Sequence, residues 1–354
     1  PAHDEEAVLP SLLNALDRLD YPRPLYEVIV IADNCGDATA RIAREHGARV
    51  LERTDLTRRG KGQALGWALD PLVREGRHDA FVILDADSRP AADLLVHLGA
   101  ALRDGALAAQ AYCAVGNAAE SWRAALMAGD LALVHLLRPL GRRALGGSAG
   151  LQGNGMCLTR ELLRAVPWDT VSVAEDQEYH LRLVRAGIRV VFVPRAVVHT
   201  VMQTTMRTAR AQELRWEGGR FDLARRHVPA LLGDAWRKRS WGALELTLDL
   251  LTPPFALLAL GTGVIGAVRG IVWAVAGGSG TAVALWGLVI AAQTFYVLAG
   301  CILARVPART YAALALYGPL YAVAKVWYCL LVARGGPQQW VPTPRGGHDR
   351  VSVG

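Results

Sequence analysis

The stretch Phe81-Val-Ile-Leu-Asp-Ala-Asp-Ser88 joins four apolar residues to two aspartates that are separated by one residue. An apolar run of this length predicts a strand buried on both faces, as in a sheet covered by helices. Ligands of open α/β sheets bind beyond the carboxyl ends of the strands, where Asp85 and Asp87 would lie. Two close carboxylates suit a hard divalent cation such as Mg2+ or Mn2+, which in turn suits a diphosphate. A simple turn is the alternative interpretation, because Asp and Ser are common where strands end.

Ahead of this stretch, segments with helical spacing alternate with short apolar runs. Helices are predicted at 5–19, at 37–47 and from the end of the basic loop 58–62 to about residue 74, and strands at 27–33 and 48–52. The alternation predicts right-handed crossovers and an α/β fold, Rossmann-like, with a mostly parallel sheet and helices on both faces. Strand 27–33 also ends in an acid, so Asp33 and Asp87 would lie at the same edge of the sheet.

The pattern continues beyond the two aspartates. Further strands are predicted at 108–114, 156–159 and 189–193, and further helices at 91–104, 120–138, 178–185 and 207–227. A glycine-rich loop at 141–155 precedes the strand at 156–159. These elements extend the same layered domain to about residue 205.

The region after Trp241 is mostly apolar, and it raises the hydrophobic content of the chain to 52% and its mean hydropathy to +0.21. An interfacial helix is predicted at 241–251, followed by candidate membrane spans at 255–276, 281–304 and 310–333. The third segment contains Pro319 and Lys325, so it is the weakest span and could instead lie in the interface. With three spans the C-terminal tail would lie across the membrane from the N-terminal domain, and with two it would lie on the same side.

The net charge of +7 is concentrated in the basic segment 207–239, directly ahead of the apolar region. Basic residues at that place favour anionic lipid headgroups over nucleic acid. The five cysteines form no CxxC pair, which indicates neither a zinc site nor a disulfide framework and favours a reducing, cytosolic environment. No signal peptide is recognised, and because the chain starts at Pro1 without Met we expect an upstream strand and membrane segment.

Six short motifs follow one another over about 215 residues: Pro1-Ala-His-Asp-Glu-Glu6, Ala32-Asp-Asn34, Arg59-Gly-Lys-Gly62, Asp85-Ala-Asp87, Glu175-Asp-Gln-Glu-Tyr179 and Gln212-Glu-Leu-Arg-Trp216. Each motif is weak alone, but the ordered set followed by apolar segments is specific. The chain resembles membrane-anchored family 2 glycosyltransferases of the cellulose-synthase-like, exopolysaccharide-forming branch. The resemblance implies a GT-A fold, a nucleotide-sugar donor and inversion at the anomeric carbon.

The resemblance assigns the first residues to the donor nucleotide. Pro1, Ala2 and Glu5 match positions that line the nucleotide pocket, although Glu5 could equally be an acid at a helix N-terminus. Asp33 matches the aspartate that accepts a hydrogen bond from uracil, with a turn residue as the alternative. Lys61 matches a lysine near the nucleotide, and the flanking glycines let the backbone approach a ligand.

The resemblance assigns the chemistry to three acids. Asp85 and Asp87 match the metal-binding pair, and Asp85 also belongs to the nucleotide-sugar site. Asp176 matches the general base that takes the proton of the acceptor hydroxyl, with a helix cap as the alternative. His199 lies where some GT-A enzymes have a third metal ligand, but a lone histidine is more often structural or exposed.

The resemblance also assigns an acceptor and diphosphate region. Gln212, Arg215 and Trp216 match the QxxRW motif, in which Arg can neutralise pyrophosphate and Trp can stack on an acceptor sugar. A membrane-proximal belt of Arg and Trp is the alternative interpretation. The loop Gln152-Gly-Asn-Gly155 falls where relatives shape the acceptor site, although such loops are often only turns.

The predicted protein is therefore an integral membrane protein with a cytosolic catalytic domain at the bacterial inner or plasma membrane. The domains are 1–205 (catalytic), 206–254 (basic and interfacial helices), 255–333 (two or three spans) and 334–354 (tail). It would be an inverting, metal-dependent hexosyltransferase that moves a sugar from UDP-sugar, in preference to GDP-sugar, to a glycan or lipid-linked acceptor. Its partners would be these substrates and membrane lipids, with no nucleic acid. The alternatives are a processive polysaccharide synthase, a non-enzymatic nucleotide-sensing membrane protein and a basic nucleic-acid-binding protein.

Overall fold

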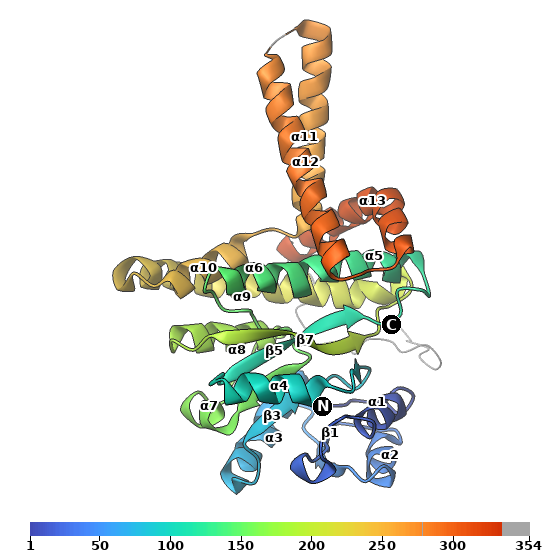
Figure 1. Ribbon diagram of the computed structural model, residues 1–354, viewed down its shortest axis with the longest axis vertical. Coiled ribbons are helices and arrows are strands. Elements are labelled where there is room, and N and C mark those ends of the chain that lie inside the picture. Colours follow the sequence, from blue (N-terminus) through green and yellow to red (C-terminus); the bar gives the residue numbers. More distant parts are fainter. Residues whose placement is uncertain (278, 335–354) are drawn as a thin grey trace.

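Figure 1 shows the computed structural model, in which residues 1–277 and 279–334 are described. A sheet-containing N-terminal part lies below a layer of long helices, and a pair of helices projects from that layer. The strands are β1 (Ile29–Asp33), β2 (Arg49–Arg53), β3 (Ala80–Ile83), β4 (Arg89–Pro90), β5 (Ala108–Val115), β6 (Met156–Thr159) and β7 (Val190–Thr200).

The helices of the N-terminal part follow the order that the sequence predicts, except for a short helix at 160–165 that was not predicted. They are α1 (Leu9–Leu16), α2 (Thr39–Glu45), α3 (Lys61–Glu75), α4 (Leu94–Arg103), α7 (Arg160–Ala165) and α8 (Glu175–Arg185), with a short 3-10 turn at Arg23–Leu25. The upper layer and the projection contain α5 (Trp122–Leu131), the π-helical η2 (Ala132–Leu137), α6 (Arg138–Ala144), α9 (Met206–Lys238), α10 (Trp241–Leu251), α11 (Phe255–Ala276), α12 (Gly280–Leu303) and α13 (Ala308–Ala333).

The predicted mostly parallel sheet is wrong, because the main sheet is mixed. Its order is β3-β6-β5-β7-β4, and only the β5–β7 pair is parallel among its four pairings. Strand β6 enters between β3 and β5 and runs against both. An apolar run reports that a strand is buried on both faces but carries no information on its direction, so the sequence could not supply this arrangement.

A second, smaller sheet carries the N-terminus. Strands β1 and β2 pair in parallel and bring Asp33 opposite Arg53 at their carboxyl ends. Ala2 extends this sheet through a parallel bridge to Ala32, with a hydrogen bond of 2.8 Å from its N–H to the Ile31 carbonyl. The first residues of the chain are therefore fixed beside Asp33.

The helices do cover both faces of the main sheet, as predicted. Met156 and Leu158 belong to the core cluster that includes residues of α3 and α8, whereas Cys157 belongs to the cluster under α4. Successive side chains of a strand point to opposite faces, so β6 is buried on both sides. This explains why the strands read as continuous apolar runs.

Within residues 1–277 and 279–334, four helical stretches are long and apolar enough to cross a membrane: Trp122–Ala144, Phe255–Ala276, Gly280–Leu303 and Ala308–Ala333. The last three correspond to the predicted spans, and the first extends the helix predicted at 120–138. Helices α11 and α12 project as a pair, and α11 has no buried residue. By contrast, most of Trp122–Ala144 is buried, and α13 lies along α5 in the layer. The predicted C-terminal tail, from residue 335 onward, lies outside the described residues.

Candidate active site

Lys61 lies at the centre of an acidic cluster at the start of α3. Its ammonium group is 2.5 Å from Asp85 Oδ1, and it also donates to the Gly153 carbonyl. Burial acts to lower the pKa of Lys61, but neighbouring carboxylates outweigh this effect and raise it. Those carboxylates belong to Asp85, Glu175 and Asp176. The structure thus brings together three residues that the motifs predict: Lys61, Asp85 and Asp176.

Asp176 sits in the first turn of α8, where its Oδ1 accepts the Gln177 N–H at 2.8 Å. Burial raises the pKa of Asp176, and the charge of Lys61 opposes part of that rise. Burial and the Asp176 charge likewise raise the pKa of the adjacent Glu175. A carboxylate with a raised pKa is a stronger base, which suits the removal of a hydroxyl proton.

Two glycines allow this cluster to be compact. A Cβ added to Gly62 would lie 2.7 Å from Glu175 Cβ, so α3 approaches α8 more closely than any other residue would permit. Gly153 has a φ of +74°, and a Cβ there would lie 3.4 Å from both Asp176 Oδ2 and Lys61 Nζ. Glycine is favoured at Gly153 both by this backbone conformation and by the crowding.

The loop that carries the two aspartates is held by Asn154, which the motif search did not single out by itself. Asn154 Oδ1 accepts the Asp85 N–H at 3.2 Å, and its Nδ2 donates to Ser88 Oγ at 2.8 Å. Gln110 on β5 in turn donates to the Asn154 carbonyl at 2.7 Å and accepts the Gln152 N–H at 3.0 Å. The predicted acceptor loop 152–155 is therefore also the support of the aspartate loop.

Asp85 and Asp87 fit a divalent cation in the chemistry of their donors. Both are partly exposed, both offer hard oxygen ligands, and the Lys61 ammonium beside Asp85 shows that the site accepts positive charge. His199, for which an exposed or structural role was favoured over that of a third ligand, is an exposed residue of β7. It pairs with Arg89 of β4, two residues after Asp87.

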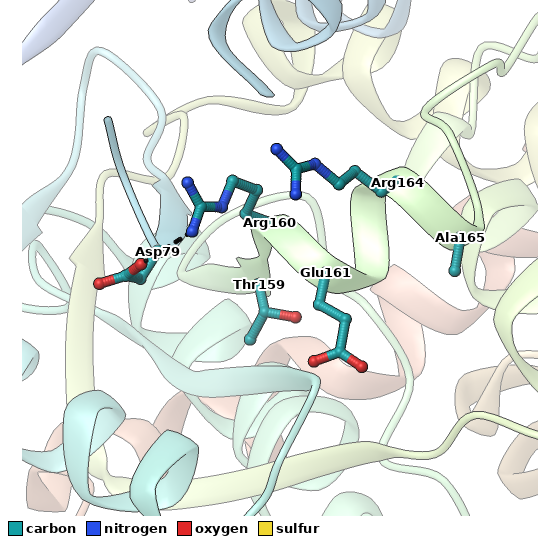
Figure 2. A pocket seen from close by; sticks show the side chains of 6 residues that line it. All are labelled: Asp79, Thr159, Arg160, Glu161, Arg164 and Ala165. Atoms are coloured by element: carbon teal, nitrogen blue, oxygen red, sulfur yellow. Dashed lines mark hydrogen bonds and ion pairs between the residues drawn. The ribbon is translucent and has the colours of Figure 1, made fainter. Parts of the chain in front are cut away.

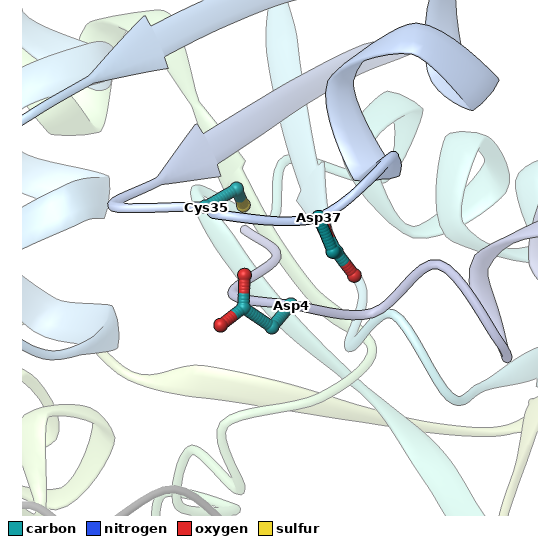
Figure 3. A group of neighbouring side chains, drawn as sticks. All are labelled: Asp4, Cys35 and Asp37. Atoms are coloured by element: carbon teal, nitrogen blue, oxygen red, sulfur yellow. The ribbon is translucent and has the colours of Figure 1, made fainter. Parts of the chain in front are cut away.

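Another acidic group, Asp4, Cys35 and Asp37, gathers its ligand atoms within 4.8 Å (Figure 3). Its carboxylates already accept backbone amides: Asp4 Oδ1 from Gly36 at 2.7 Å, and Asp37 from Thr39 and Glu6 at 2.9 and 3.0 Å. These bonds connect the N-terminal segment to the loop before α2. The cluster therefore holds these two segments together and is not interpreted as a metal centre.

Asp33 is buried at the end of β1 and receives two hydrogen bonds on Oδ1, from Arg53 Nη1 at 2.6 Å and Asn34 Nδ2 at 3.1 Å. Arg53 is a second residue that sequence reasoning missed, although its place at the end of the adjacent strand was a usable signal. The Pro1 nitrogen lies within electrostatic range of Asp33, Glu5 and the Lys61–Asp85 pair. The residues predicted to bind the donor nucleotide therefore lie near one another, at one edge of the sheets.

The predicted motif Gln212–Trp216 lies on α9, one face of which touches the start of α8. Gly219 follows Gln212 by seven residues and Trp216 by three, so all three share that face. A Cβ on Gly219 would lie 2.8 Å from Ala174 Cβ, directly before Glu175. Trp216 is 37% exposed. The same helical spacing places Arg215 beside them.

Two pockets of the N-terminal part are considered as possible substrate sites. A cleft of about 540 Å3 is lined by residues 57–63 and by the segment 169–175, and it includes Lys61 and Glu175. A second pocket of about 580 Å3 lies around Arg160 and Arg164, where Asp79 precedes β3 (Figure 2). Asp79 and Asp85 are at opposite ends of β3, so the second pocket lies away from the acidic cluster. The first cleft is the one that adjoins the candidate site.

Comparison with known proteins identifies the class. Residues 1–219 match the model described as "Glycosyltransferase like family 2". The chain belongs to this family of glycosyltransferases, as its motifs predict. It is 30% identical over 271 residues to "Beta-monoglucosyldiacylglycerol synthase" of Trichormus variabilis, covering 73% of this chain and 56% of that protein. The chain spans about half the length of the curated relatives it matches.

Solved structures show the same fold. The mannosyltransferase PcManGT of Pyrobaculum calidifontis, in complex with GDP-Man and Mn2+, has a TM-score of 0.52 and 20% identity, covering 93% of this chain and 85% of that one. S. aureus TarS 1–349 with UDP-GlcNAc has a TM-score of 0.51 and 15% identity, covering 95% and 90%. The N-terminal part thus has the GT-A glycosyltransferase fold with a mixed sheet, followed by a C-terminal region of apolar helices.

Proposed function

We propose that this protein is an inverting, metal-dependent glycosyltransferase that moves a hexose from a UDP-sugar to a lipid acceptor at a membrane surface. The acidic cluster of Lys61, Asp85 and Asp176 is the observation that carries the proposal. A base with a raised pKa beside a cation-binding aspartate pair is what displacement of a diphosphate requires. The relatives named as glucosyldiacylglycerol synthases favour a diacylglycerol-type acceptor.

The proposed reaction is a single displacement. The acceptor hydroxyl oxygen attacks the anomeric carbon, Asp176 takes the hydroxyl proton, and the bond from that carbon to the diphosphate oxygen breaks with inversion. Asp85 and Asp87 would hold Mg2+ or Mn2+, which stabilises the negative charge of the leaving diphosphate when bound. Lys61 adds a positive charge at the same place, and this charge opposes the rise that burial causes in the pKa of Asp176.

The donor and acceptor would enter from different sides. Pro1, Ala2, Glu5 and the Asp33–Arg53 pair would hold the nucleotide at the edge of the small sheet. Gln212, Arg215 and Trp216 would bind the acceptor and the diphosphate from α9, with Trp216 offering a partly exposed face for stacking. The two groups approach each other at the start of α8, where Gly219 meets Ala174.

The helical layer would place this site at a cytosolic membrane face. Helices α11 and α12 project together from the layer, and most of their side chains are exposed to the surroundings. An exposed apolar surface of that size is typical of contact with lipid. On this arrangement residues 1–205 form the catalytic unit, 206–254 the interfacial helices and 255–333 the membrane region.

A processive polysaccharide synthase is the alternative within the family. A translocation channel needs several lipid-embedded helices, whereas one of the four apolar stretches described here is mostly buried against the catalytic unit. A nucleotide-sensing membrane protein is the non-enzymatic alternative, and it would bind nucleotide without releasing a product.

The full chain in detergent micelles tests the proposal with UDP-glucose, other nucleotide sugars, dioleoylglycerol and Mn2+ or Mg2+. We expect glycolipid formation together with UDP release, and Asp176→Asn should abolish transfer while UDP binding stays within about twofold of the parent. Asp93→Asn, a change at the start of α4, is the matched control. Transfer by Asp176→Asn at the parent rate would contradict the assigned base, and a long polymer product would establish the processive alternative.

A further inference from the structure

A buried cluster of charges joins the helix that carries Gln212 and Trp216 to α5 and α13. Glu213 on α9 accepts from Arg123 on α5 at 2.8 Å and from Lys325 on α13 at 2.6 Å, using a different oxygen for each. Lys325 also lies 2.8 Å from Glu217, one turn further along α9. The Tyr321 hydroxyl donates to Glu213 at 3.2 Å.

Three of the four charged groups are buried, and the side chain of Glu217 is 11% exposed. Arg123 and Glu213 are fully buried, and Lys325 is 6% exposed. Apolar residues of the same helices pack around them, including Met127, Leu131 and Leu214. A third carboxyl group, that of Asp130 on α5, interacts electrostatically with all four of these charged groups.

A buried cluster of charges is an energetically unfavourable way to pack helices. Removal of charges from water has a large free-energy cost for each ion, and apolar side chains of similar size often pack equally well. The best-supported benefit of a buried ionic contact is that it specifies one register and one orientation of its helices. Here the contacts fix both the rotation and the sliding position of α9, because Glu213 and Glu217 are one turn apart and share Lys325.

The rotation of α9 matters for the candidate active site. Gln212, Trp216 and Gly219 lie on the face next to the one that Glu213 and Glu217 occupy. When the two glutamates are held toward α13, that neighbouring face meets α8 at Ala174, one residue before Glu175. Arg123 also donates to the Gln203 carbonyl at 2.6 Å, which anchors the segment that leads from β7 into α9.

We infer that Lys325 is a positioning residue for the transfer reaction. Through Glu213 and Glu217, it sets the rotation of α9 that presents Gln212 and Trp216 to the acceptor beside Asp176. The inference rests on the proposed function, since it assigns an acceptor role to those two residues. It also makes α13 part of the catalytic unit rather than an independent membrane anchor.

The test replaces Lys325 in the full chain, assayed with UDP-glucose and dioleoylglycerol in mixed micelles. We expect Lys325→Met to raise the acceptor KM or lower the transfer kcat by about tenfold, while the donor KM stays within about twofold. Backbone hydrogen exchange of segment 206–219 should rise by about tenfold or more, with α4 unchanged. Arg309→Met, which removes a cation at the other end of α13, is the control and should leave both readouts unchanged.

Tyr321→Phe provides a milder variant in case Lys325→Met does not fold, because it removes one hydroxyl and keeps every charge. It should raise the acceptor KM by about two- to fivefold with no change in donor KM. Unchanged exchange in segment 206–219 of Lys325→Met, or of Tyr321→Phe if the first variant is unfolded, would overturn the inference. An equal rise in the donor KM and the acceptor KM would also overturn the inference, because the cluster would then only stabilise the fold.

The proposed function is tested separately from the role of Lys325. If the parent chain transfers no sugar, or if Asp176→Asn remains active, the function is wrong. Hydrogen exchange in the Lys325 and Tyr321 variants still reports whether the cluster orders segment 206–219.

Discussion

The Lys61 ammonium lies 2.5 Å from Asp85 Oδ1, so one residue of the proposed metal pair is also the partner of a partly buried cation. Lys61 interacts electrostatically with Asp176 as well. A single positive charge is therefore shared between the group that would handle the leaving diphosphate and the group that would take the acceptor proton.

Lys61→Met is expected to shift the acid limb of the pH–rate profile to higher pH. The positive charge of Lys61 lowers the pKa of Asp176 and opposes the effect of burial, so its removal raises that pKa further. Because the base acts in its ionised form, the rate then begins to fall at a higher pH as the solution is acidified. The measurement is kcat against pH at saturating donor and metal.

Arg59→Met is the control for that shift, since it removes a cation from the same loop outside the acidic cluster. The acid limb of the pH–rate profile of Arg59→Met should coincide with that of the unmodified protein, even if its kcat differs. An acid limb in Lys61→Met at the parent position would show that Lys61 does not control the ionisation of the base.

Asn154→Ala should weaken metal activation. Asn154 holds the loop between Asp85 and Ser88 through two side-chain hydrogen bonds, each worth about 1 kcal/mol. Their loss frees the carboxylates from one orientation, so the Mn2+ concentration for half-maximal activity should rise by about tenfold. Titration of UDP-glucose turnover with Mn2+ measures this directly.

Ser88→Ala is the matched comparison, because it removes only the second of these two bonds. It should raise the Mn2+ requirement by a smaller factor, about two- to threefold. If Asn154→Ala responds to Mn2+ like the parent, the loop does not depend on this amide.

Gly62→Ala should reduce transfer even though alanine favours helices over glycine by about 1 kcal/mol. The added methyl group would lie 2.7 Å from Glu175 Cβ and 2.9 Å from Thr170 Oγ1, so α3 and the start of α8 must separate. Displacement of Asp176 by a fraction of an ångström should lower kcat by about tenfold or more. Steady-state kinetics at saturating substrates is the measurement.

Gly36→Ala is the control for added bulk, since a Cβ there meets nothing within 4 Å. It should leave kcat unchanged. A fully active Gly62→Ala variant would mean that the close approach of α3 and α8 has no part in catalysis.

Much of the architecture could be predicted from local patterns. The apolar runs at β1 and β3 and the periodic segments at α3 and α10 give the element order, and the predicted 241–251 helix has the bounds observed for α10. Strand directions could not be predicted, because β6 forms its pairs across more than forty residues of intervening chain. The same apolar sequence fits either direction.

The residues of the candidate site could also be predicted only in part. Residue type and motif order predict Lys61, Asp85 and Asp176, and the structure places them in one cluster. The roles of Asn154 and Lys325 could not be predicted, because each depends on a partner that is distant in sequence. The predicted roles of the motif residues remain predictions until the variants are assayed.

Acid sensitivity should depend on His180, which is buried in α8 and has its Nε2 2.8 Å from Ser148 Oγ. Burial lowers the pKa of His180 to about 3, from an ordinary value of 6.5 in the unfolded chain. Between these values only the unfolded chain binds the extra proton, so stability is complete above pH 6.5 and falls as the pH decreases toward 3.

The free energy of unfolding should therefore fall by about 2 kcal/mol between neutral pH and about pH 5 through this residue alone. His180→Gln removes the titrating group, so its stability should depend less steeply on pH in this range even if it is lower at neutral pH. His97→Gln, a change at a partly exposed histidine of α4, is the control and should keep the steep dependence of the parent. Thermal unfolding in micelles at the two pH values measures the difference, and a His180→Gln variant that loses as much stability as the parent would show that another buried group controls the acid response.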